Sequence, residues 1–345
     1  MRIHTQHLDV GGPAQPLLTV RGLTKHFPLK NGATVRAVDG VDFEVLKGET
    51  LGVVGESGCG KSTTARLLMH LIDPTQGELI FDGRCVGSRD LPLKEFRRQV
   101  QMVFQDSYAS LNPRLTIEDS IAFGPQVHGV SKKEAIARTH YLMDRVGLTP
   151  SRFAERYPHE LSGGQRQRIN IARALALQPR MVILDEAVSA LDKSVEAQVL
   201  NLLSDLKREF GLTYVFISHD LGVVHYISDR VMVMYLGQVA EIGPSDALFS
   251  QPAHPYTKAL LSSVPSMDPA HRTQQAPLTG DPPNPINPPS GCRFHPRCPK
   301  ATPVCAERIP TISEVQRHHQ ARCLIHEFSS GHPLAAADMP PALAA

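Results

Sequence analysis

The sequence lacks a strong excess of either charge sign, a long apolar run and an internal repeat. A net charge of +2 over 345 residues argues against a nucleic-acid binder, because phosphate neutralisation needs a clustered excess of lysine and arginine. No run approaches about 18 consecutive apolar residues, so we expect no segment to span a bilayer. The start, MRIHTQHLDVGG, has no apolar secretory core. We therefore expect a cytoplasmic protein that serves a membrane process only as a peripheral subunit.

Cysteine is scarce, but four of the six cysteines cluster near the carboxyl end. Intervals of five, six and seventeen residues separate Cys292, Cys298, Cys305 and Cys323. In a reducing cytoplasm such clustering indicates a metal before it indicates disulfides. The intervals exceed the roughly two to four residues typical of zinc knuckles and do not match ferredoxin spacings. The pattern therefore predicts a metal site and leaves zinc and iron–sulfur open, with His295, His318 and His319 as alternative ligands.

Strand-like and helix-like segments alternate along the chain. Residues 1–15 are polar and expected to be disordered, and the stretches LLTVRGL and TVRAVDGVDFEV that follow predict an antiparallel sheet. TLGVVG (50–55), MVILDE (181–186) and TYVFISHD (213–220) are apolar runs of the kind buried in parallel sheets, each followed by helix-forming sequence. This alternation predicts a doubly wound α/β core. Residues 107–170 predict an inserted helical subdomain.

The composition changes after Gly243. The segment PLTGDPPNPINPPSG (277–291) contains six prolines, which predict an extended connector ahead of the cysteines. The last residues, 329–345, are rich in alanine and proline and are expected to be disordered. We therefore expect a nucleotide-binding domain over 16–246 and an extension over 247–328.

GESGCGKS, at Gly55–Ser62, matches the full phosphate-binding loop pattern. Its glycines let backbone N–H groups turn towards phosphate oxygens, and the following helix start adds positive potential. We expect Lys61 to reach the β- and γ-phosphates and the Ser62 hydroxyl to coordinate Mg²⁺. The expected nucleotide-binding residues here are Gly55, Glu56, Ser57, Gly58, Cys59, Gly60, Lys61, Ser62 and Thr63.

Two further motifs follow the loop in order. LSGGQ, at Leu161–Gln165, precedes helix-forming sequence, so we expect Ser162, Gly163, Gly164 and Gln165 to form a second anion-binding helix start. Asp185 and Glu186 end the MVILDE strand, where adjacent side chains point to opposite faces and can take different tasks. LSGGQ between a phosphate-binding loop and an acidic strand resembles the signature of the ATP-binding cassette family.

This resemblance implies an α/β fold with a RecA-like core, an antiparallel β subdomain, a helical subdomain and a cysteine-rich extension. It implies ATP and Mg²⁺ as cofactors and two cassettes joined head-to-tail, with the signature facing the partner's γ-phosphate. Family members usually carry proline after the catalytic glutamate, whereas this chain has Ala187, which removes no reactive group. We expect ATPase activity to be retained. The resemblance implies that Asp185 binds Mg²⁺, that Glu186 polarises the attacking water and that Gln105 contacts the metal and this water. It implies that His219 contacts the γ-phosphate and that Phe27 stacks on adenine. Asp192 is implied to link the two sites.

The carboxyl end carries a narrower resemblance. HPYTKALLSSVP (254–265), the proline-rich segment and GCRFHPRCP resemble the extension of oligopeptide and dipeptide importer ATPases, most closely the F-type subunit of dipeptide importers. The likeness covers nearly all of residues 17–326. It implies a structural [4Fe-4S] cluster on the four clustered cysteines, with Zn²⁺ as the alternative.

The resemblance implies an ATP hydrolase that powers import of di- or oligopeptides from the cytoplasmic face of the inner membrane. The implied partners are a second, different ATPase chain, two membrane permeases and an extracellular or periplasmic peptide-binding protein, with no nucleic acid. Glutathione or nickel chelates are alternative cargoes. A cassette ATPase outside transport is the alternative class, but this chain carries neither a second cassette nor long coiled coils.

Overall fold

The structure is a computed structural model that describes residues 16–30, 32–263 and 280–335. The predicted disordered start and residues 336–345 of the predicted tail lie outside the described residues, as do the first three residues of the proline-rich segment. The chain divides into two compact units that alternate along the sequence. Of the described residues, the first unit holds 16–19, 44–50 and 80–218, and the second holds 20–30, 32–43, 51–79, 219–263 and 280–335.

Three parallel strands form the sheet of the first unit. They are β6 (Val100–Val103), β7 (Met181–Asp185) and β8 (Thr213–Ile217), with β7 in the middle. Every residue of β7 and β8 is buried, which explains their unbroken apolar runs. Because parallel strands end at the same edge, the carboxyl end of β7 lies beside that of β6, and Asp185 pairs with Ile217 of β8.

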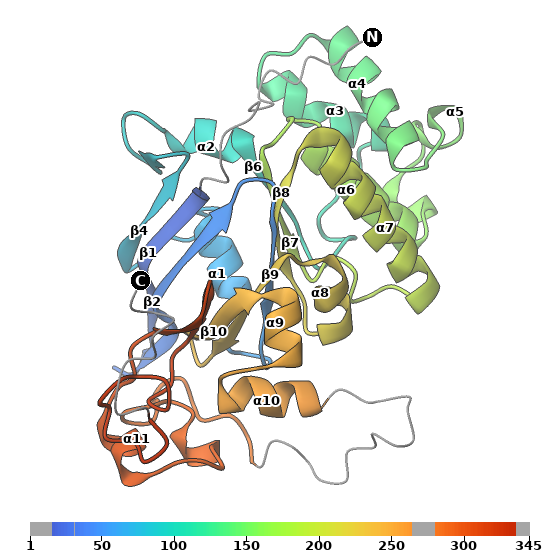
Figure 1. Ribbon diagram of the computed structural model, residues 1–345. Helices are drawn as coiled ribbons and strands as arrows, with labels where there is room; N and C mark the ends of the chain where they lie inside the picture. Colours follow the sequence, from blue (N-terminus) through green and yellow to red (C-terminus); the bar gives the residue numbers. More distant parts are fainter. Residues whose placement is uncertain (1–15, 31, 264–279, 336–345) are drawn as a thin grey trace. The chain divides into compact units, whose positions relative to one another are not determined.

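Helices make up most of the remainder of the first unit. The range 107–170 contains α3 (Ile117–Val127), α4 (Lys132–Arg145), α5 (Pro150–Phe153), the 3₁₀ turn η1 (Pro158–Glu160) and the start of α6 (Gly163–Leu175). In Figure 1, α3 packs against α4 and α6, and α7 (Lys193–Phe210) lies against α6. A shorter helix, α2 (Leu93–Gln99), leads into β6.

The sheet of the second unit joins the nucleotide core to the extension. Its strands lie in the order β11 (Ser313–Gln316), β12 (His319–Ala321), β10 (Gln238–Pro244), β9 (Arg230–Tyr235) and β3 (Thr50–Val54). β3 and β9 are parallel, whereas the other pairs are antiparallel. The extension therefore adds two short strands to β10, with Ile242 opposite Gln320.

An antiparallel sheet has the order β2-β1-β4-β5, from β1 (Pro16–Pro28), β2 (Thr34–Leu46), β4 (Gln76–Phe81) and β5 (Arg84–Cys85). The stretches LLTVRGL and TVRAVDGVDFEV predict an antiparallel sheet here. The described part of the proline-rich segment, residues 280–291, contains neither helix nor strand, and its Pro285 carbonyl accepts from the Arg36 N–H of β2 at 3.1 Å. The helices of the second unit are α1 (Lys61–Leu68), α8 (Leu221–Ile227), α9 (Ser245–Ser250), α10 (Pro255–Ser262), the 3₁₀ turn η3 (His295–Arg297) and α11 (Pro303–Glu307) (Figure 1).

Candidate nucleotide-binding site

The phosphate-binding loop lies between β3 and α1, in the strand–loop–helix order that its motif requires. Gly55 and Gly60 have positive φ angles of 150° and 108°. A Cβ atom on Gly55 would lie 2.2 Å from the Met234 carbonyl oxygen, and one on Gly60 would lie 2.4 Å from that of Ala37. Both positions therefore need glycine, because the backbone conformation and the close neighbours exclude a side chain.

Lys61 lies inside the curve of this loop. Its ammonium donates to the carbonyl oxygens of Gly55 at 2.7 Å and Glu56 at 3.0 Å, and the residue is only 7% exposed. The neighbouring Cys59 is also buried, and burial raises the pKa of its thiol. The loop thus holds one shielded positive charge beside a neutral thiol, at the amino end of α1, where anions are stabilised. Ser62 is the second residue of that helix.

Gln105 and Glu186 are in direct contact within the first unit. The Gln105 amide nitrogen donates to a Glu186 carboxylate oxygen at 2.9 Å. Glu186 follows β7 with a φ of 49°, a left-handed conformation uncommon for a residue other than glycine, and its N–H donates to the Ile217 carbonyl at 2.9 Å. Such strain often occurs at functional sites. The amide can orient the carboxylate, while Asp185, one residue earlier, is 6% exposed.

The LSGGQ segment forms the start of α6 as predicted from its pattern. Ser162 and Gln165 make a capping box: the Gln165 N–H donates to the Ser162 hydroxyl at 3.3 Å, and the Ser162 N–H donates to the Gln165 side chain at 2.9 Å. Ser162 is exposed. A Cβ atom on Gly164 would lie 2.5 Å from Cγ1 of Val195 on α7, so this glycine permits close packing of the two helices.

The other predicted site residues are placed as follows. Asp192 is the exposed residue that immediately precedes α7. Phe27 lies near the end of β1 in the second unit, 37% exposed, with the Lys25 ammonium 5.2 Å from its ring centroid. His219 also belongs to the second unit, directly before Asp220, whose side chain accepts from the Gly222 N–H of α8 at 2.9 Å.

Sequence reasoning misses the contacts that the loop residue Glu56 makes with the extension. Its carboxylate accepts two hydrogen bonds from Arg297, and its N–H donates to the Tyr256 hydroxyl. Local sequence patterns give Tyr256 and Arg297 no role. The ion pair between Glu56 and Arg297 joins positions 241 residues apart, so no local pattern indicates it.

The four clustered cysteines line one cavity of the extension, together with His254, His295 and His332 among others. All four are free thiols. Burial raises the pKa of Cys292 to about 11 and that of Cys323 to about 12. In the described part of the chain, no three histidine, cysteine or acidic side chains come together as ligands of one metal ion.

The predicted alternative histidine ligands differ in their surroundings. His295 lines this cavity, whereas His318 is exposed and His319 is buried against Glu241 at 2.7 Å. Thus His318 and His319 do not belong to the cavity lining.

Comparison with known proteins places this arrangement in a family. The sequence profile of the ABC transporter family matches residues 38–189, and that of the oligopeptide/dipeptide transporter C-terminal region matches residues 240–305. A probable peptide ABC transporter ATP-binding protein of Sinorhizobium fredii, y4tS, is 50% identical over 333 residues, covering 94% of this chain and 93% of its own. The oligopeptide transport ATP-binding protein AppF of Bacillus subtilis is 49% identical, with 90% of this chain and 98% of its own covered.

The chain belongs to the ATPase subunits of the ABC transporter family. Solved cassettes share its α/β fold. The protein cbiO1 of Clostridium perfringens, described as part of the ABC transporter complex cbiONQ, has a TM-score of 0.61 at 27% identity, covering 68% of this chain and 91% of its own. The cassette MJ0796, in a dimeric structure bound to ADP and Pi, has a TM-score of 0.59 at 29% identity, with coverages of 66% and 98%.

The predicted resemblance to ABC ATPases with this extension is thereby confirmed. ATP and Mg²⁺ are the cofactors expected of such an ATPase. Among the helices that the structure describes, none has both the length and the apolar composition needed to cross a membrane.

Proposed function

We propose that this ABC ATPase powers the import of di- or oligopeptides through a membrane transporter. The observation that carries the proposal is the match of residues 240–305 to the oligopeptide/dipeptide transporter C-terminal region. Relatives that are 50% identical in sequence carry names that specify peptide import. Glutathione and nickel chelates are the alternative cargoes, and a cassette ATPase outside transport is the alternative class.

Uptake of labelled di- and tripeptides by cells that depend on this chain tests the proposal. Lys61→Ala should abolish uptake, because the ammonium that neutralises the β- and γ-phosphates is lost. Labelled glutathione and a nickel chelate, offered to the same cells, distinguish the cargoes. Normal peptide uptake with Lys61→Ala contradicts the motor role, and uptake of nickel alone contradicts the peptide assignment.

For ATP hydrolysis, we propose that Glu186 polarises the attacking water while Gln105 contacts the metal and this water. The 2.9 Å bond between their side chains supports the pairing, since it fixes one carboxylate oxygen of Glu186. Ser62 and Asp185 contribute to Mg²⁺ binding, Lys61 and His219 act on the γ-phosphate, and Phe27 stacks on adenine. Phosphoryl transfer depends mainly on positioning and charge neutralisation, which these groups supply.

The working unit is proposed to be a pair of cassettes with composite sites. The exposed Ser162 at the start of α6 supports this, because a capped helix start open to solvent can receive a partner's phosphate. Asp192 links the two sites. The partners are a second, different ATPase chain, two permeases and a peptide-binding protein, at the cytoplasmic face of the inner membrane. Glu186→Gln, mixed with the second ATPase chain, should trap an ATP-bound dimer of the two chains on gel filtration, and separate monomers with bound ATP contradict the arrangement.

The proposed domains are a cassette over 16–246 and an extension over 247–328. Within the extension, we propose that Cys292, Cys298, Cys305 and Cys323 hold a [4Fe-4S] cluster. Backbone N–H groups of Phe294, Lys300 and Ile325 donate towards three of the sulfurs, which offsets part of the rise in thiol pKa that burial causes. All four cysteines line one cavity, as a shared cluster requires, and Zn²⁺ is the alternative.

Metal analysis of anaerobically purified protein tests the cluster. Iron and acid-labile sulfide should appear in equal amounts, and both should be lost in Cys298→Ser. Stoichiometric zinc without sulfide contradicts the cluster. The cluster would supply a structural crosslink among four chain positions, and its chemistry takes no part in ATP hydrolysis.

A further inference from the structure

The extension makes a charged contact with the phosphate-binding loop. Arg297 donates from its two terminal nitrogens to the two Glu56 carboxylate oxygens, at 2.8 Å and 3.0 Å. The Arg297 side chain is 6% exposed and that of Glu56 is 21% exposed, so water screens this pair only partly. Bidentate guanidinium–carboxylate pairs fix orientation as well as charge.

Glu56 is held through its backbone as well. Its N–H donates to the Tyr256 hydroxyl at 2.9 Å, and its carbonyl oxygen accepts from Lys61 at 3.0 Å. Tyr256 lies on α10 and is fully buried. The peptide groups on both sides of Glu56 therefore have fixed directions, and one of them holds the lysine of the loop.

A cluster of aromatic residues also holds the Arg297 side chain. It donates to the Tyr235 hydroxyl at 3.4 Å, and the Tyr235 ring contacts those of Tyr256 and Phe294, with centroids 4.6 Å and 5.3 Å apart. Because Arg297 ends η3 directly before Cys298, the backbone that aims the guanidinium also carries a cysteine of the thiol cavity.

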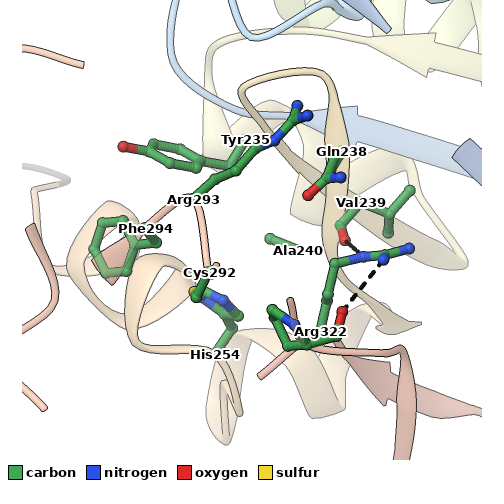
Figure 2. A pocket seen from close by; sticks show the side chains of 10 residues that line it. Tyr235, Gln238, Val239, Ala240, His254, Cys292, Arg293, Phe294 and Arg322 are labelled. Atoms are coloured by element: carbon green, nitrogen blue, oxygen red, sulfur yellow. Dashed lines mark hydrogen bonds between the residues drawn. The ribbon is translucent and has the colours of Figure 1, made fainter. Parts of the chain in front are cut away.

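A second arginine repeats this arrangement. Arg293, directly after Cys292, donates to the Asp39 carboxylate of β2, whose other oxygen lies 2.8 Å from Nε2 of His26. His26 directly precedes Phe27, the proposed adenine platform. Figure 2 shows the Arg293 side chain leaving the Cys292 segment and passing close to Tyr235.

We propose that Arg297 is a positioning residue for ATP, so that the extension sets the nucleotide affinity of the phosphate-binding loop. The inference rests on the proposed function, in that this loop binds ATP. Without the guanidinium, the Glu56 carboxylate stands unpaired in the loop that receives the phosphates. Its negative charge repels them, and the loop loses one of the contacts that fix its shape.

Dissociation constants for MgATP, measured by calorimetry on the full-length protein, test this. Arg297→Ala should raise the constant at least about tenfold, which corresponds to about 1.4 kcal/mol. Arg297→Lys should raise it less, because one charge remains without the bidentate fork. Adding Glu56→Gln to Arg297→Ala should restore most of the affinity, since the unpaired charge is removed; loss of packing alone cannot produce that recovery.

The matched control is Arg322→Ala. Arg322 is also a partly buried arginine next to a cavity cysteine, but its side chain donates to the carbonyl oxygens of Val239 and Pro310. Figure 2 shows the bond to Val239. Its loss should leave the affinity within about twofold of wild type. Equal losses in Arg322→Ala and Arg297→Ala overturn the proposal, as does wild-type affinity in a folded Arg297→Ala.

Two further variants keep the outcomes distinct. If Arg297→Ala does not fold, Arg297→Lys and Tyr256→Phe carry the test, and wild-type affinity in both overturns the proposal. Lys61→Ala reports on the proposed function separately. If Lys61→Ala binds ATP as tightly as wild type, the ATP site itself is wrong. If only Lys61→Ala loses affinity, the ATP site stands and the role of Arg297 falls.

Discussion

The buried carboxylate of Glu241 joins the extension to the sheet of the second unit. Glu241 is fully buried and His319 is 1% exposed, with His319 Nε2 at 2.7 Å from the carboxylate. The N–H groups of Ala253 and His254 also donate to it, at 2.7 Å and 2.9 Å. A buried carboxylate is tolerated only when its oxygens are paired, so His319→Ala should loosen the attachment of β12 to β10.

The magnitude follows from what remains around the carboxylate. Removing a hydrogen-bond partner from a buried group costs about 1–3 kcal/mol, and more where that group is charged. Glu241 is a carboxylate that keeps its two backbone donors, so we expect about 3 kcal/mol. That loss corresponds to a roughly hundredfold larger population with β12 detached, since about 1.4 kcal/mol is a factor of ten.

Hydrogen exchange measures this opening directly. Peptides that contain β12 should exchange roughly a hundredfold faster in His319→Ala, whereas β7 in the first unit should keep its protection. The control is His318→Asn, which changes the exposed residue next to His319. His318 has a positive φ of 61°, a backbone conformation that asparagine tolerates. Equal exchange in wild type and His319→Ala, or an equal loss of protection in His318→Asn, refutes the reasoning.

The same carboxylate gives a pH dependence. Burial alone would raise the pKa of Glu241, but hydrogen bonds from His319 and from the N–H groups of Ala253 and His254 hold the pKa below its ordinary value of 4.5. Its stabilising contribution is therefore present above about pH 4.5 and is lost as the pH falls through the folded-state pKa. Urea midpoints of Glu241→Gln should fall less than those of wild type on acidification; parallel curves contradict the assignment.

Three further predictions concern the ATP site. Gly60→Ala should abolish MgATP binding in calorimetry, because its Cβ would lie 2.4 Å from the Ala37 carbonyl oxygen at a φ of 108°; measurable binding at the wild-type level contradicts the close approach. Gln105→Ala should slow ATP turnover by about tenfold or more, because Glu186 loses the donor that orients it. The MgATP dissociation constant should stay within about twofold of wild type. A changed affinity with unchanged turnover refutes this role. Gly164→Ala should lower the melting temperature, since its Cβ would lie 2.5 Å from Val195, and adding Val195→Ala should restore it; no restoration contradicts the steric cause.

Local sequence patterns predict much of the nucleotide core. The apolar runs of β3, β7 and β8 are buried throughout, and LSGGQ forms the start of α6, as its place before helix-forming sequence predicts; a capping box closes this start. In each case the physical cause acts over a few residues. Burial on both faces of a strand requires an unbroken apolar run, and a capping box requires two side chains three positions apart.

The contacts of the extension have no such local cause. The strand Ser313–Gln316 alternates between partly and fully exposed residues, and its neighbour β12 has three residues, too few to produce a period. Arg297 and Glu56 stand 241 positions apart, and each alone is an ordinary charged residue. Their pairing depends on tertiary packing, which one sequence does not reveal. His319 is predicted as an alternative metal ligand, but its Nε2 contacts the carboxylate of Glu241. This partner is distant in the sequence, so no local pattern indicates it.

Sheet pairing alone does not bring the extension to the phosphate-binding loop. In the order β11-β12-β10-β9-β3, two strands separate β12 from the strand that leads into the loop. The segment around Phe294 bridges that interval, because its ring packs on Tyr235 at the end of β9 and on Tyr256, whose hydroxyl already holds Glu56. The two attachments therefore differ in kind: the Glu241–His319 pair fixes the extension to the sheet edge, and the aromatic cluster directs Arg297 across the sheet to the loop. Loosening β12 should consequently weaken ATP binding less than removing Arg297 does.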